Sequence, residues 1–318
     1  MTKMLVREKT QMSFRWGKEP SKRSLEELLQ ASVINLDKPQ GPTSHQVSAW
    51  VRNIFDINKV GHGGTLDPKV SGVLPIALGK ATRAMDLVLQ SDKEYVCVMR
   101  LHRDVEEEKV RSVIDTFVGE IYQMPPVRAA VKRQLRTRRV HFIDILEIEG
   151  RDVLFRVGTD AGTYIRTLCV DIGEALGIGA HMESLRRARS GSMIEDDSVT
   201  LQDIKDAHVY WKEDGDERPL RRMLMPWEVI LEPIPKIVLK GTAVDAICHG
   251  ADLAAVGVQE VESTVEKKQL VALLTDKGEG VALAIAEMIA QQMVDAKEGL
   301  AARTNRVFMD PGTYPKMW

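Results

Sequence analysis

The sequence predicts an α+β chain with two domains, a large one built on a mixed or antiparallel sheet and a small β-barrel or sandwich of roughly 80 residues. At 318 residues, the chain exceeds the usual size of one compact domain. Strand-like and helix-like segments alternate irregularly, which favours α+β over a doubly wound fold. Prolines interrupt "MLMPWEVILEPIP" and place the boundary there. The expected division is an N-terminal arm over 1–30, a large domain over 31–232 and a small domain over 233–318.

The first elements follow from turn and capping signals. "SVINLDK" predicts a strand, and the prolines and glycine of "PQGP" supply the turn after it. Thr43 and Gln46 have the spacing of a capping box, and Val47, Trp50 and Val51 continue at helical spacing, so a helix is expected. A strand over "GVLPIAL" and a helix over 81–90 are expected after the glycine-rich stretch "GHGGTLDP".

The later elements follow from hydrophobic periodicity. "EYVCVMRLH" predicts a strand, and "EEEKVRSVIDTFVG" predicts a helix that stops at Gly119. Two strands are expected over 140–148 and 152–159, followed by a helix over "GTYIRTLCVDIGEALG" that ends at Gly177. Beyond the boundary, "KIVLK", "AVDAICHG", "LVALLTD" and "VALAIA" predict short strands separated by glycines.

Composition excludes several classes of protein. The 46 acidic residues offset 44 basic ones, so the net charge of −2 does not by itself indicate a nucleic-acid partner. Cys97, Cys169 and Cys248 lie far apart in apolar surroundings, which favours free buried thiols over a disulfide framework or a zinc cluster. No apolar stretch approaches about 20 residues, and the basic N-terminus lacks the apolar core of a secretory signal. We therefore expect a cytoplasmic protein without a membrane partner.

One segment concentrates positive charge. No acidic residue occurs over 125–143, whereas twelve residues within it carry six positive charges: Arg128, Lys132, Arg133, Arg136, Arg138 and Arg139. A solvated face of a hairpin is the simpler interpretation. A mobile basic arm that closes on a polyanion is the alternative, because the run follows "MPP" and is interleaved with apolar residues.

The stretch "GHGGTLDP" permits several roles for Asp67. A phosphate-binding loop fails on spacing, because Gly72 and Gly79 are six residues apart and Ala81 follows Lys80. A metal site lacks support, since no histidine or cysteine stands at ligand spacing from His62. An acid that ends a glycine-rich loop can cap a turn, or it can project from a rigid backbone as a nucleophile or base. Local chemistry alone leaves both roles open.

Motifs along the whole chain resemble one family, the TruB class of pseudouridine synthases, and within it the dyskerin-like catalytic subunit of archaeal and eukaryotic H/ACA guide RNPs. "GHGGTLDPKVSGVLP" matches the family's catalytic loop, "DKEY" its second motif, "AGTYIRTL" its third and "GAHMESLRRARSG" a fourth. "IYQMPPVRAAVKRQLRTRRV", "AVDAICHGADL" and "MDPGTYPKMW" match the dyskerin-like subfamily. The motifs occur in the family's order and cover almost the whole chain.

The resemblance implies the roles of individual residues. Asp67 is the essential carboxylate, Tyr95 stacks on the target base and takes part in proton transfer, and Arg166 pairs with Asp67 inside the cleft. Tyr164 lines the cleft, and Leu185 packs on the base. The chemistry suits these residue types. A guanidinium favours the ionised form of a carboxylate that burial would otherwise neutralise, and an aromatic ring offsets part of the cost of unstacking a flipped uridine.

Further implied contacts concern RNA. His62 matches a loop histidine that helps RNA binding, and the basic arm matches a thumb-like loop over the substrate. The implied phosphate contacts are Arg128, Lys132, Arg133 and Arg136, with Arg186 and Arg187 on the same surface. The small domain resembles a PUA domain, which in relatives holds the ACA trinucleotide of the guide RNA or a tRNA 3′ end. The family packs the N-terminal arm against that domain.

The function implied is isomerisation of uridine to pseudouridine in rRNA, directed by H/ACA guide RNA and small core proteins, and in the T-loop of tRNA. The reaction is redox-neutral, so no cofactor or metal is expected. A stand-alone tRNA synthase and a non-catalytic RNA scaffold are the alternatives. The presence of Asp67, Tyr95 and Arg166 together disfavours the scaffold. The nearly neutral charge departs from the strongly basic character of relatives, which predicts weaker non-specific RNA affinity.

Overall fold

The computed structural model describes residues 3–8, 16–125 and 134–317. The chain divides into two compact units. The central unit comprises Ser32–Met225, and the terminal unit combines Met1–Ala31 with Pro226–Trp318. Among the helices of the described residues, none is long and apolar enough to cross a membrane.

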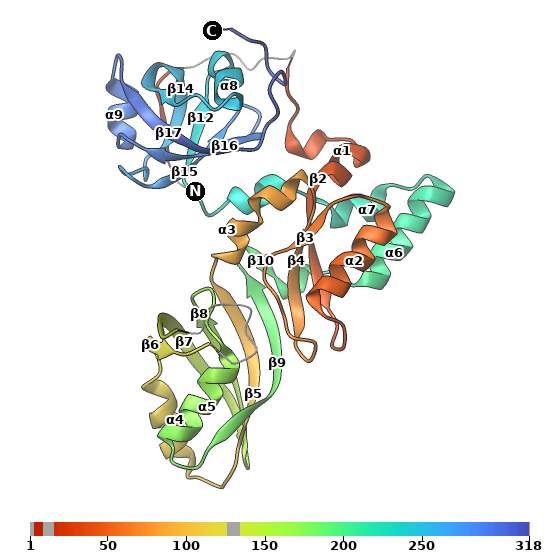
Figure 1. The fold of residues 1–318 in the computed structure, drawn as a ribbon, viewed down its shortest axis with the longest axis vertical. Coiled ribbons are helices and arrows are strands. Elements are labelled where there is room, and N and C mark those ends of the chain that lie inside the picture. Colours follow the sequence, from red (N-terminus) through yellow and green to blue (C-terminus); the bar gives the residue numbers. More distant parts are fainter. Residues whose placement is uncertain (1–2, 9–15, 126–133, 318) are drawn as a thin grey trace. The chain divides into compact units, whose positions relative to one another are not determined.

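A mixed sheet organises the central unit (Figure 1). Its strands run in the order β11-β2-β4-β9-β5-β8-β7-β6, with β3 beside β4 and β10 beside β9. The pair β4·β9 is parallel, whereas β5·β9, β5·β8, β7·β8, β6·β7, β3·β4 and β9·β10 are antiparallel, which confirms the expected mixed sheet. The strands are β2 (Ala31–Lys38), β3 (Val60–His62), β4 (Ser71–Gly79), β5 (Lys93–Leu101), β6 (Gly119–Gln123), β7 (Arg136–Glu149), β8 (Asp152–Thr159), β9 (Ala180–Ser190), β10 (Met193–Ile194) and β11 (Met225–Pro226).

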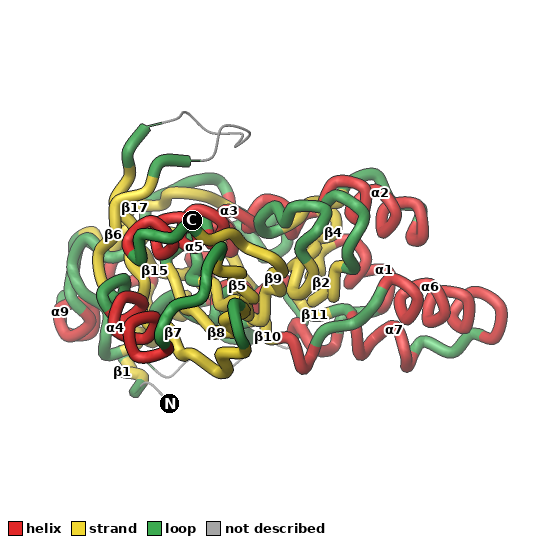
Figure 2. The backbone as a smooth tube through the Cα atoms, turned by 90° about the horizontal axis from the view of Figure 1, so that it is seen from below, coloured by secondary structure: helices red, strands yellow, loops and turns green. Residues whose placement is uncertain are grey.

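Helices cover this sheet through apolar faces. The helices are α2 (Ser44–Phe55), α3 (Met85–Leu89), α4 (Glu107–Asp115), α5 (Ile165–Ala175), α6 (Leu201–Val209) and α7 (Arg218–Met223). Helix α5 lies against β9 and β5 and buries Ile165, Leu168, Cys169 and Ile172, the face that the sequence predicted. Figure 2 shows α6 and α7 close together at one end of the unit, where α6 also contacts α2.

The capping box at the start of α2 forms as the sequence predicted. Thr43 Oγ1 accepts a hydrogen bond from the Gln46 amide (3.1 Å), and the Gln46 side chain accepts one from the Thr43 amide (2.8 Å). The helix buries Val47, Val51 and Phe55. Trp50 differs from the expectation, because 45% of it is exposed.

Some predicted elements need correction. The expected helix over 81–90 is a 3-10 turn over Lys80–Ala84 followed by the short helix α3. Helix α4 ends at Asp115, and Gly119 begins strand β6 rather than stopping the helix. Strand β9 occupies the fourth motif. The sequence analysis did not predict a strand there, because the segment contains many charged side chains. Strand β8 has the predicted bounds, Asp152–Thr159.

The terminal unit contains a second sheet with the strand order β1-β14-β12-β15-β16-β17-β13. Its strands are β1 (Met4–Val6), β12 (Lys236–Leu239), β13 (Leu253–Ala254), β14 (Val258–Glu262), β15 (Leu270–Leu274), β16 (Gly280–Ala286) and β17 (Leu300–Val307). Its helices are α1 (Leu25–Gln30), α8 (Gly241–Cys248) and α9 (Ala290–Asp295). The predicted strand at "AVDAICHG" is wrong, because Val244, Ile247 and Cys248 face the core at helical spacing in α8.

N-terminal residues belong to this second sheet. Strand β1 pairs antiparallel with β14. Arg7 donates to the carbonyl of Met293 (2.7 Å), and the amide of Lys18 donates to the buried carboxylate of Glu279 (3.0 Å). Arg23 forms a half-buried ion pair with Glu228 (2.6 Å). Two stretches of the terminal unit that lie more than 200 residues apart in sequence therefore share one core.

The cysteines are free and buried, as expected. Cys97 on β5 and Cys169 on α5 are far apart in sequence, yet their sulfur atoms lie 3.7 Å apart. The hydrogen bond with the Cys169 thiol, followed by burial, raises the pKa of Cys97. The Cys97 thiol is therefore protonated and unreactive at neutral pH.

Candidate active site

The loop between β3 and β4 carries Asp67 and is tightly fixed. Ser44, at the start of α2, is fully buried and bonds both backbone groups of Leu66, accepting from its amide (2.8 Å) and donating to its carbonyl (3.2 Å). The Asp67 carbonyl accepts from the Val70 amide (3.0 Å), and the Pro68 carbonyl accepts from the Gly41 amide (2.8 Å). Asp67 therefore begins a turn and also projects its carboxylate from a rigid backbone.

Lys38 also fixes the loop that carries Asp67, through hydrogen bonds to backbone carbonyl oxygens. Its side chain is fully buried on β2, and its ammonium donates to the carbonyl oxygens of Val70 (2.7 Å) and Pro39 (2.8 Å). Burial lowers the pKa of Lys38, and the nearby charge of Asp67 opposes that effect. The sequence analysis missed this residue, because its bond to Val70 joins residues 32 positions apart.

Two glycines are required by this geometry. Gly64 has φ +113°, a conformation that L residues with a side chain rarely adopt. A Cβ atom at Gly72 would lie 2.3 Å from the backbone oxygen of Arg187, where β4 and β9 run in parallel. These glycines allow the loop to turn and β4 to approach β9 closely.

Arg166 pairs with Asp67 across the site. The two residues are 99 positions apart, and a guanidinium Nη2 of Arg166 contacts Oδ2 of Asp67. The sequence analysis expected this pair inside a cleft; in the free protein the two side chains are 50% and 53% exposed. Exposed ion pairs contribute at most about 1 kcal/mol to stability. The pair is therefore better suited to chemistry on a ligand that covers it than to holding the fold together.

Tyr95 and Leu185 lie on neighbouring strands. Tyr95 on β5 is opposite Arg187 on β9, and Cys97 is opposite Leu185, so Tyr95 and Leu185 are diagonal neighbours on one face of the sheet. Tyr95 is half-buried, whereas Leu185 is 9% exposed. Tyr164 is half-buried at the N-terminal cap of α5, two residues before Arg166.

The expected RNA contact of Arg187 is wrong, because this residue does not lie on the surface. Its side chain is 2% exposed, and its guanidinium donates to the carbonyl oxygens of Val73 (2.7 Å) and Gly64 (3.2 Å). Burial lowers the pKa of Arg187, and the contact with Tyr95 opposes that effect. Strand pairing across β4, β9 and β5 encloses this arginine, so it supports the loop and the tyrosine from below.

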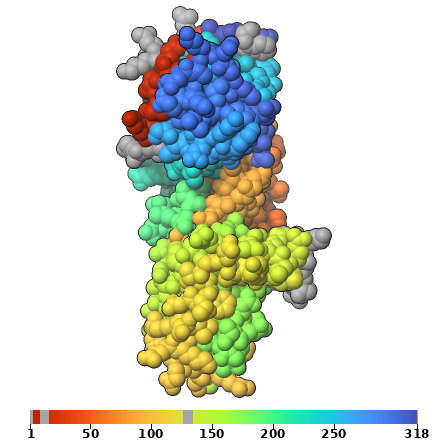
Figure 3. Space-filling model, turned by 90° about the vertical axis from the view of Figure 1, so that its left-hand side faces the viewer, coloured from red at the N-terminus to blue at the C-terminus, as the bar shows by residue number. Residues whose placement is uncertain are grey.

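The other expected RNA contacts are distributed unevenly. Arg186 is half-buried, and its charge is offset by Asp37 (3.0 Å) and Glu195 (2.6 Å). Arg136 begins β7, opposite Gln123 of β6. Figure 3 shows the yellow-green surface around the start of β7 projecting from the central unit. Three further basic residues lie outside the described residues: Arg128, Lys132 and Arg133.

His62 is a half-buried imidazole on β3. Its Nδ1 is buried and has no hydrogen-bond partner among the described residues. Its ring meets that of His45 edge to face, with centroids 5.0 Å apart. Burial lowers the pKa of His62, as do the nearby charges of His45 and Arg187. At neutral pH this side chain is therefore uncharged and contributes hydrogen bonding or stacking rather than positive charge.

Two titratable features near the site have no assigned role. Lys93, two residues before Tyr95, is 5% exposed and donates to the carbonyl of Val88 (2.6 Å), and burial lowers its pKa to about 7. Among the described residues, Asp92, His141 and Asp160 form a group with ligand atoms close enough for a metal ion. His141 already pairs with Asp160 (3.2 Å) and Asp92 (3.5 Å), so the protein itself accounts for this group.

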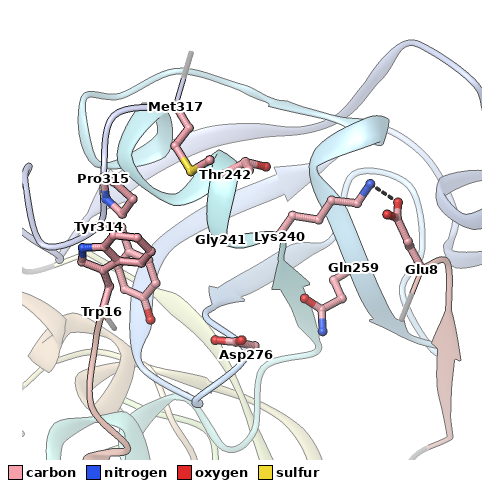
Figure 4. A pocket seen from close by; sticks show the side chains of 10 residues that line it. All are labelled: Glu8, Trp16, Lys240, Gly241, Thr242, Gln259, Asp276, Tyr314, Pro315 and Met317. Carbon is pink, nitrogen blue, oxygen red and sulfur yellow. Dashed lines mark hydrogen bonds and ion pairs between the residues drawn. The ribbon is translucent and has the colours of Figure 1, made fainter. Parts of the chain in front are cut away.

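The terminal unit contains a pocket of about 390 Å³ beside the N-terminus of α8 (Figure 4). Trp16, Tyr314 and Pro315 gather on one side of it, and the ion pair of Lys240 with Glu8 lies on the other. Tyr314 is 2% exposed and donates to Glu279 (2.7 Å). The pocket is also lined by Gly241, Thr242, Gln259, Asp276 and Met317. Aromatic faces beside amide and charged groups suit a planar, polar ligand.

Comparisons with known families match the chain in four segments. Residues 52–165 match the N-terminal domain of TruB family pseudouridylate synthase, and residues 166–232 match the C-terminal domain of tRNA pseudouridylate synthase B. Residues 235–308 match the PUA domain, and residues 1–48 match the DKCLD (NUC011) domain.

Relatives and solved structures match over nearly the whole chain. The probable tRNA pseudouridine synthase B of Methanopyrus kandleri is 55% identical, covering 99% of this chain and 93% of the relative. The corresponding protein of Methanocaldococcus jannaschii is 50% identical, covering 99% and 94%. A chain from an H/ACA RNP bound to a substrate RNA containing 2′-deoxyuridine superposes with a TM-score of 0.93 at 49% identity, covering 100% of this chain and 98% of that one. A chain from a Cbf5-Nop10-Gar1 complex gives 0.92 at 51% identity, covering 99% and 97%.

These matches confirm the resemblance that the motifs indicated. They run from the N-terminal arm through the catalytic loop to the PUA domain, in one order and without a large gap. The chain belongs to the TruB family of pseudouridylate synthases and has the fold of the Cbf5 protein of archaeal H/ACA RNPs.

Proposed function

We propose that this chain converts specific uridines of rRNA to pseudouridine as the catalytic subunit of an H/ACA guide RNP. The observation that carries the proposal is the exposed Asp67–Arg166 pair at a fixed loop, which Arg187 links to Tyr95, in a chain that matches H/ACA proteins from end to end. The reaction breaks the N1–C1′ bond of uridine, turns the base and joins C1′ to C5. No electrons are gained or lost overall, so no cofactor is required.

Asp67 is the proposed nucleophile or base. The hydrogen bonds around Leu66, Pro68 and Val70 fix its backbone, which favours one orientation of the carboxylate towards a bound nucleotide. Arg166 offsets its negative charge through the ion pair. A bound RNA would cover the exposed pair and strengthen their attraction by excluding water.

The proposed base contacts surround this carboxylate. Tyr95 stacks on the flipped uridine, a contact worth about 1–3 kcal/mol, and takes part in proton transfer. Leu185, its diagonal neighbour, packs on the base, and Tyr164 lines the cleft at the start of α5. His62, uncharged at neutral pH, helps to hold the RNA by hydrogen bonding or stacking.

Two surfaces are proposed to hold RNA outside the reacting nucleotide. Arg136 and the basic residues that precede β7, namely Arg128, Lys132 and Arg133, contact substrate phosphates. The pocket beside α8 takes a nucleobase of the guide RNA or of a tRNA 3′ end. Trp16 provides the stacking face, and Lys240 lies near the sugar-phosphate backbone of the RNA. Small H/ACA core proteins are the proposed protein partners, because one of the matching solved structures is a Cbf5-Nop10-Gar1 complex.

The domain assignment and compartment follow from this proposal. The arm 1–30 belongs with the PUA domain over 233–318, and residues 31–232 form the catalytic domain. The pairing of β1 with β14 supports that grouping. With RNA as the proposed substrate, the cytoplasm is the proposed compartment.

A second function is favoured by the names of the curated relatives, which are tRNA pseudouridine synthases B. We propose that the same site also modifies the T-loop uridine of tRNA without a guide. The test is to measure pseudouridine formation on a matched substrate RNA and on tRNA, each with and without guide RNA and the small core proteins. Guide-dependent activity on the matched RNA supports the main proposal. Activity confined to tRNA would replace it with the stand-alone enzyme, and no activity on either would leave an RNA scaffold.

A further inference from the structure

Gln123, the last residue of β6, makes two hydrogen bonds to the backbone of Tyr164. Its side-chain Nε2 donates to the Tyr164 carbonyl (3.2 Å), and its Oε1 accepts from the Tyr164 amide (3.0 Å). The two bonds imitate the pairing of one strand residue with another. Gln123 is 2% exposed, so water does not compete strongly for these groups.

These bonds act at the point where α5 begins. Tyr164 is the N-terminal cap residue, with extended φ and ψ of −98° and 104°, and its side chain makes no capping hydrogen bond. Its carbonyl also accepts the first bond of the helix, from the Leu168 amide (3.0 Å). Gln123 therefore holds the residue from which the first turn of α5 starts, and Arg166 projects from that turn towards Asp67.

The stem of the β6–β7 hairpin also holds the start of the loop over 160–164, which leads into α5. The Asp160 amide donates to the Arg139 carbonyl (2.9 Å), and the Arg139 amide donates to the Asp160 carboxylate (3.1 Å). Gln123 is also the cross-strand partner of Arg136, at the base of the basic arm. The strands that carry the arm are thus bonded on both sides of the loop that leads into α5.

We infer that Gln123 is a positioning residue for pseudouridine formation, which sets Tyr164 and Arg166 against Asp67 and joins the stem of the basic arm to the catalytic helix. The inference rests on the proposed function. It assigns no contact between Gln123 and RNA, because the residue is buried beneath the surface.

The test uses the full chain assembled with guide RNA, a matched substrate RNA and the small core proteins. Gln123→Met keeps the length of the side chain and removes both hydrogen bonds. Gln123→Glu keeps the acceptor for the Tyr164 amide and loses the donor to its carbonyl, unless the carboxyl is protonated. Gln202→Met and Gln202→Glu are matched controls, because Gln202 is exposed on α6 and its side chain bonds Asp206 on the same helix (2.7 Å).

Two quantities separate positioning from general stability. The single-turnover rate of tritium release from 5-tritiated uridine reports the reaction, and filter binding reports substrate affinity. We expect Gln123→Met to lower the rate constant roughly 10- to 100-fold, as expected when reacting groups shift by about an ångström, with substrate affinity unchanged within about threefold. The Gln202 variants keep the wild-type values.

The pH profile of Gln123→Glu is the second readout, and it stands even if Gln123→Met does not fold. Its rate relative to the wild type should rise as the pH falls, because a protonated carboxyl again donates to the Tyr164 carbonyl. Among the residues that the structure describes, three charged groups bear on this titration: Arg136 opposite it on β7, and Arg139 and Asp160 at the start of the loop that leads into α5. Gln202→Glu should show no such rise.

The inference is overturned if Gln123→Met turns over at the wild-type rate, if its rate falls only in step with substrate affinity, or if the Gln123→Glu ratio is flat with pH. These results require an active wild-type complex. An inactive wild-type complex would instead refute the proposed function, so the two failures are distinguishable.

Discussion

Replacing Asp67 by Asn removes the negative charge from the proposed active site with almost no change in shape. The hydrogen bonds that fix the loop use the backbone of Leu66, Asp67 and Pro68, so they persist in the variant. An amide cannot act as a nucleophile or base as a carboxylate does. We therefore expect pseudouridine formation to fall by at least roughly 10²- to 10⁴-fold.

The same change should have little effect on stability. Asp67 and Arg166 are each about half exposed, and ion pairs of this kind contribute about 0.2–1 kcal/mol. Losing that contribution shifts the melting temperature by no more than about 4 °C in a domain of this size. Folding and guide-RNA binding should therefore survive while activity is lost.

The assay is tritium release from 5-tritiated uridine in a matched substrate, with thermal melting and guide-RNA binding measured on the same preparation. Asp115→Asn, at the exposed end of α4, is the control for loss of one negative charge. Activity retained in Asp67→Asn would refute the catalytic assignment. A collapse of the melting temperature would refute the argument that the pair is not structural.

Three further predictions follow from individual contacts. Ser44→Ala leaves buried backbone groups of Leu66 without a partner, so thermal or urea unfolding should show a loss of about 1–3 kcal/mol in the free energy of unfolding, together with a lower reaction rate. Unchanged values would contradict the argument that Ser44 fixes the loop that carries Asp67. Lys93 has a folded-state pKa of about 7, below its ordinary value of 10.5. The unfolded chain therefore binds more protons between these values, and the free energy of unfolding should rise with pH across that window. Urea titrations should show this rise in the wild type relative to Lys93→Met, and a constant difference would disprove it. Neutralising Lys132, Arg133 and Arg136 should weaken substrate binding. The slope of log binding constant against log salt concentration should become shallower by roughly 0.7–0.9 for each phosphate that the arm no longer neutralises. The same slope in both proteins would support the interpretation of the arm as a solvated hairpin.

Short-range patterns in the sequence predicted several features correctly. The capping box of Thr43 and Gln46, the buried face of α5 and the bounds of β8 each depend on interactions within a few residues. The motifs around Asp67, Tyr95 and Arg166 identified the family for the same reason, since each motif is a continuous string. Local sequence did not decide whether Asp67 capped a turn or did chemistry, and the structure shows that its backbone and side chain are engaged separately.

Only the tertiary structure decided which charged and polar side chains are enclosed. Arg187 looked like a surface cation beside Arg186, but the parallel contact of β9 with β4 buries it under the catalytic loop. Gln123 carried no sequence signal, because its partner Tyr164 lies 41 residues away. Local sequence likewise did not indicate that Lys38 is buried or that the Asp67–Arg166 pair is exposed. The physical reason is that burial depends on which strands and helices meet across the chain, whereas helix caps and hydrophobic periodicity depend on residues that are neighbours in sequence.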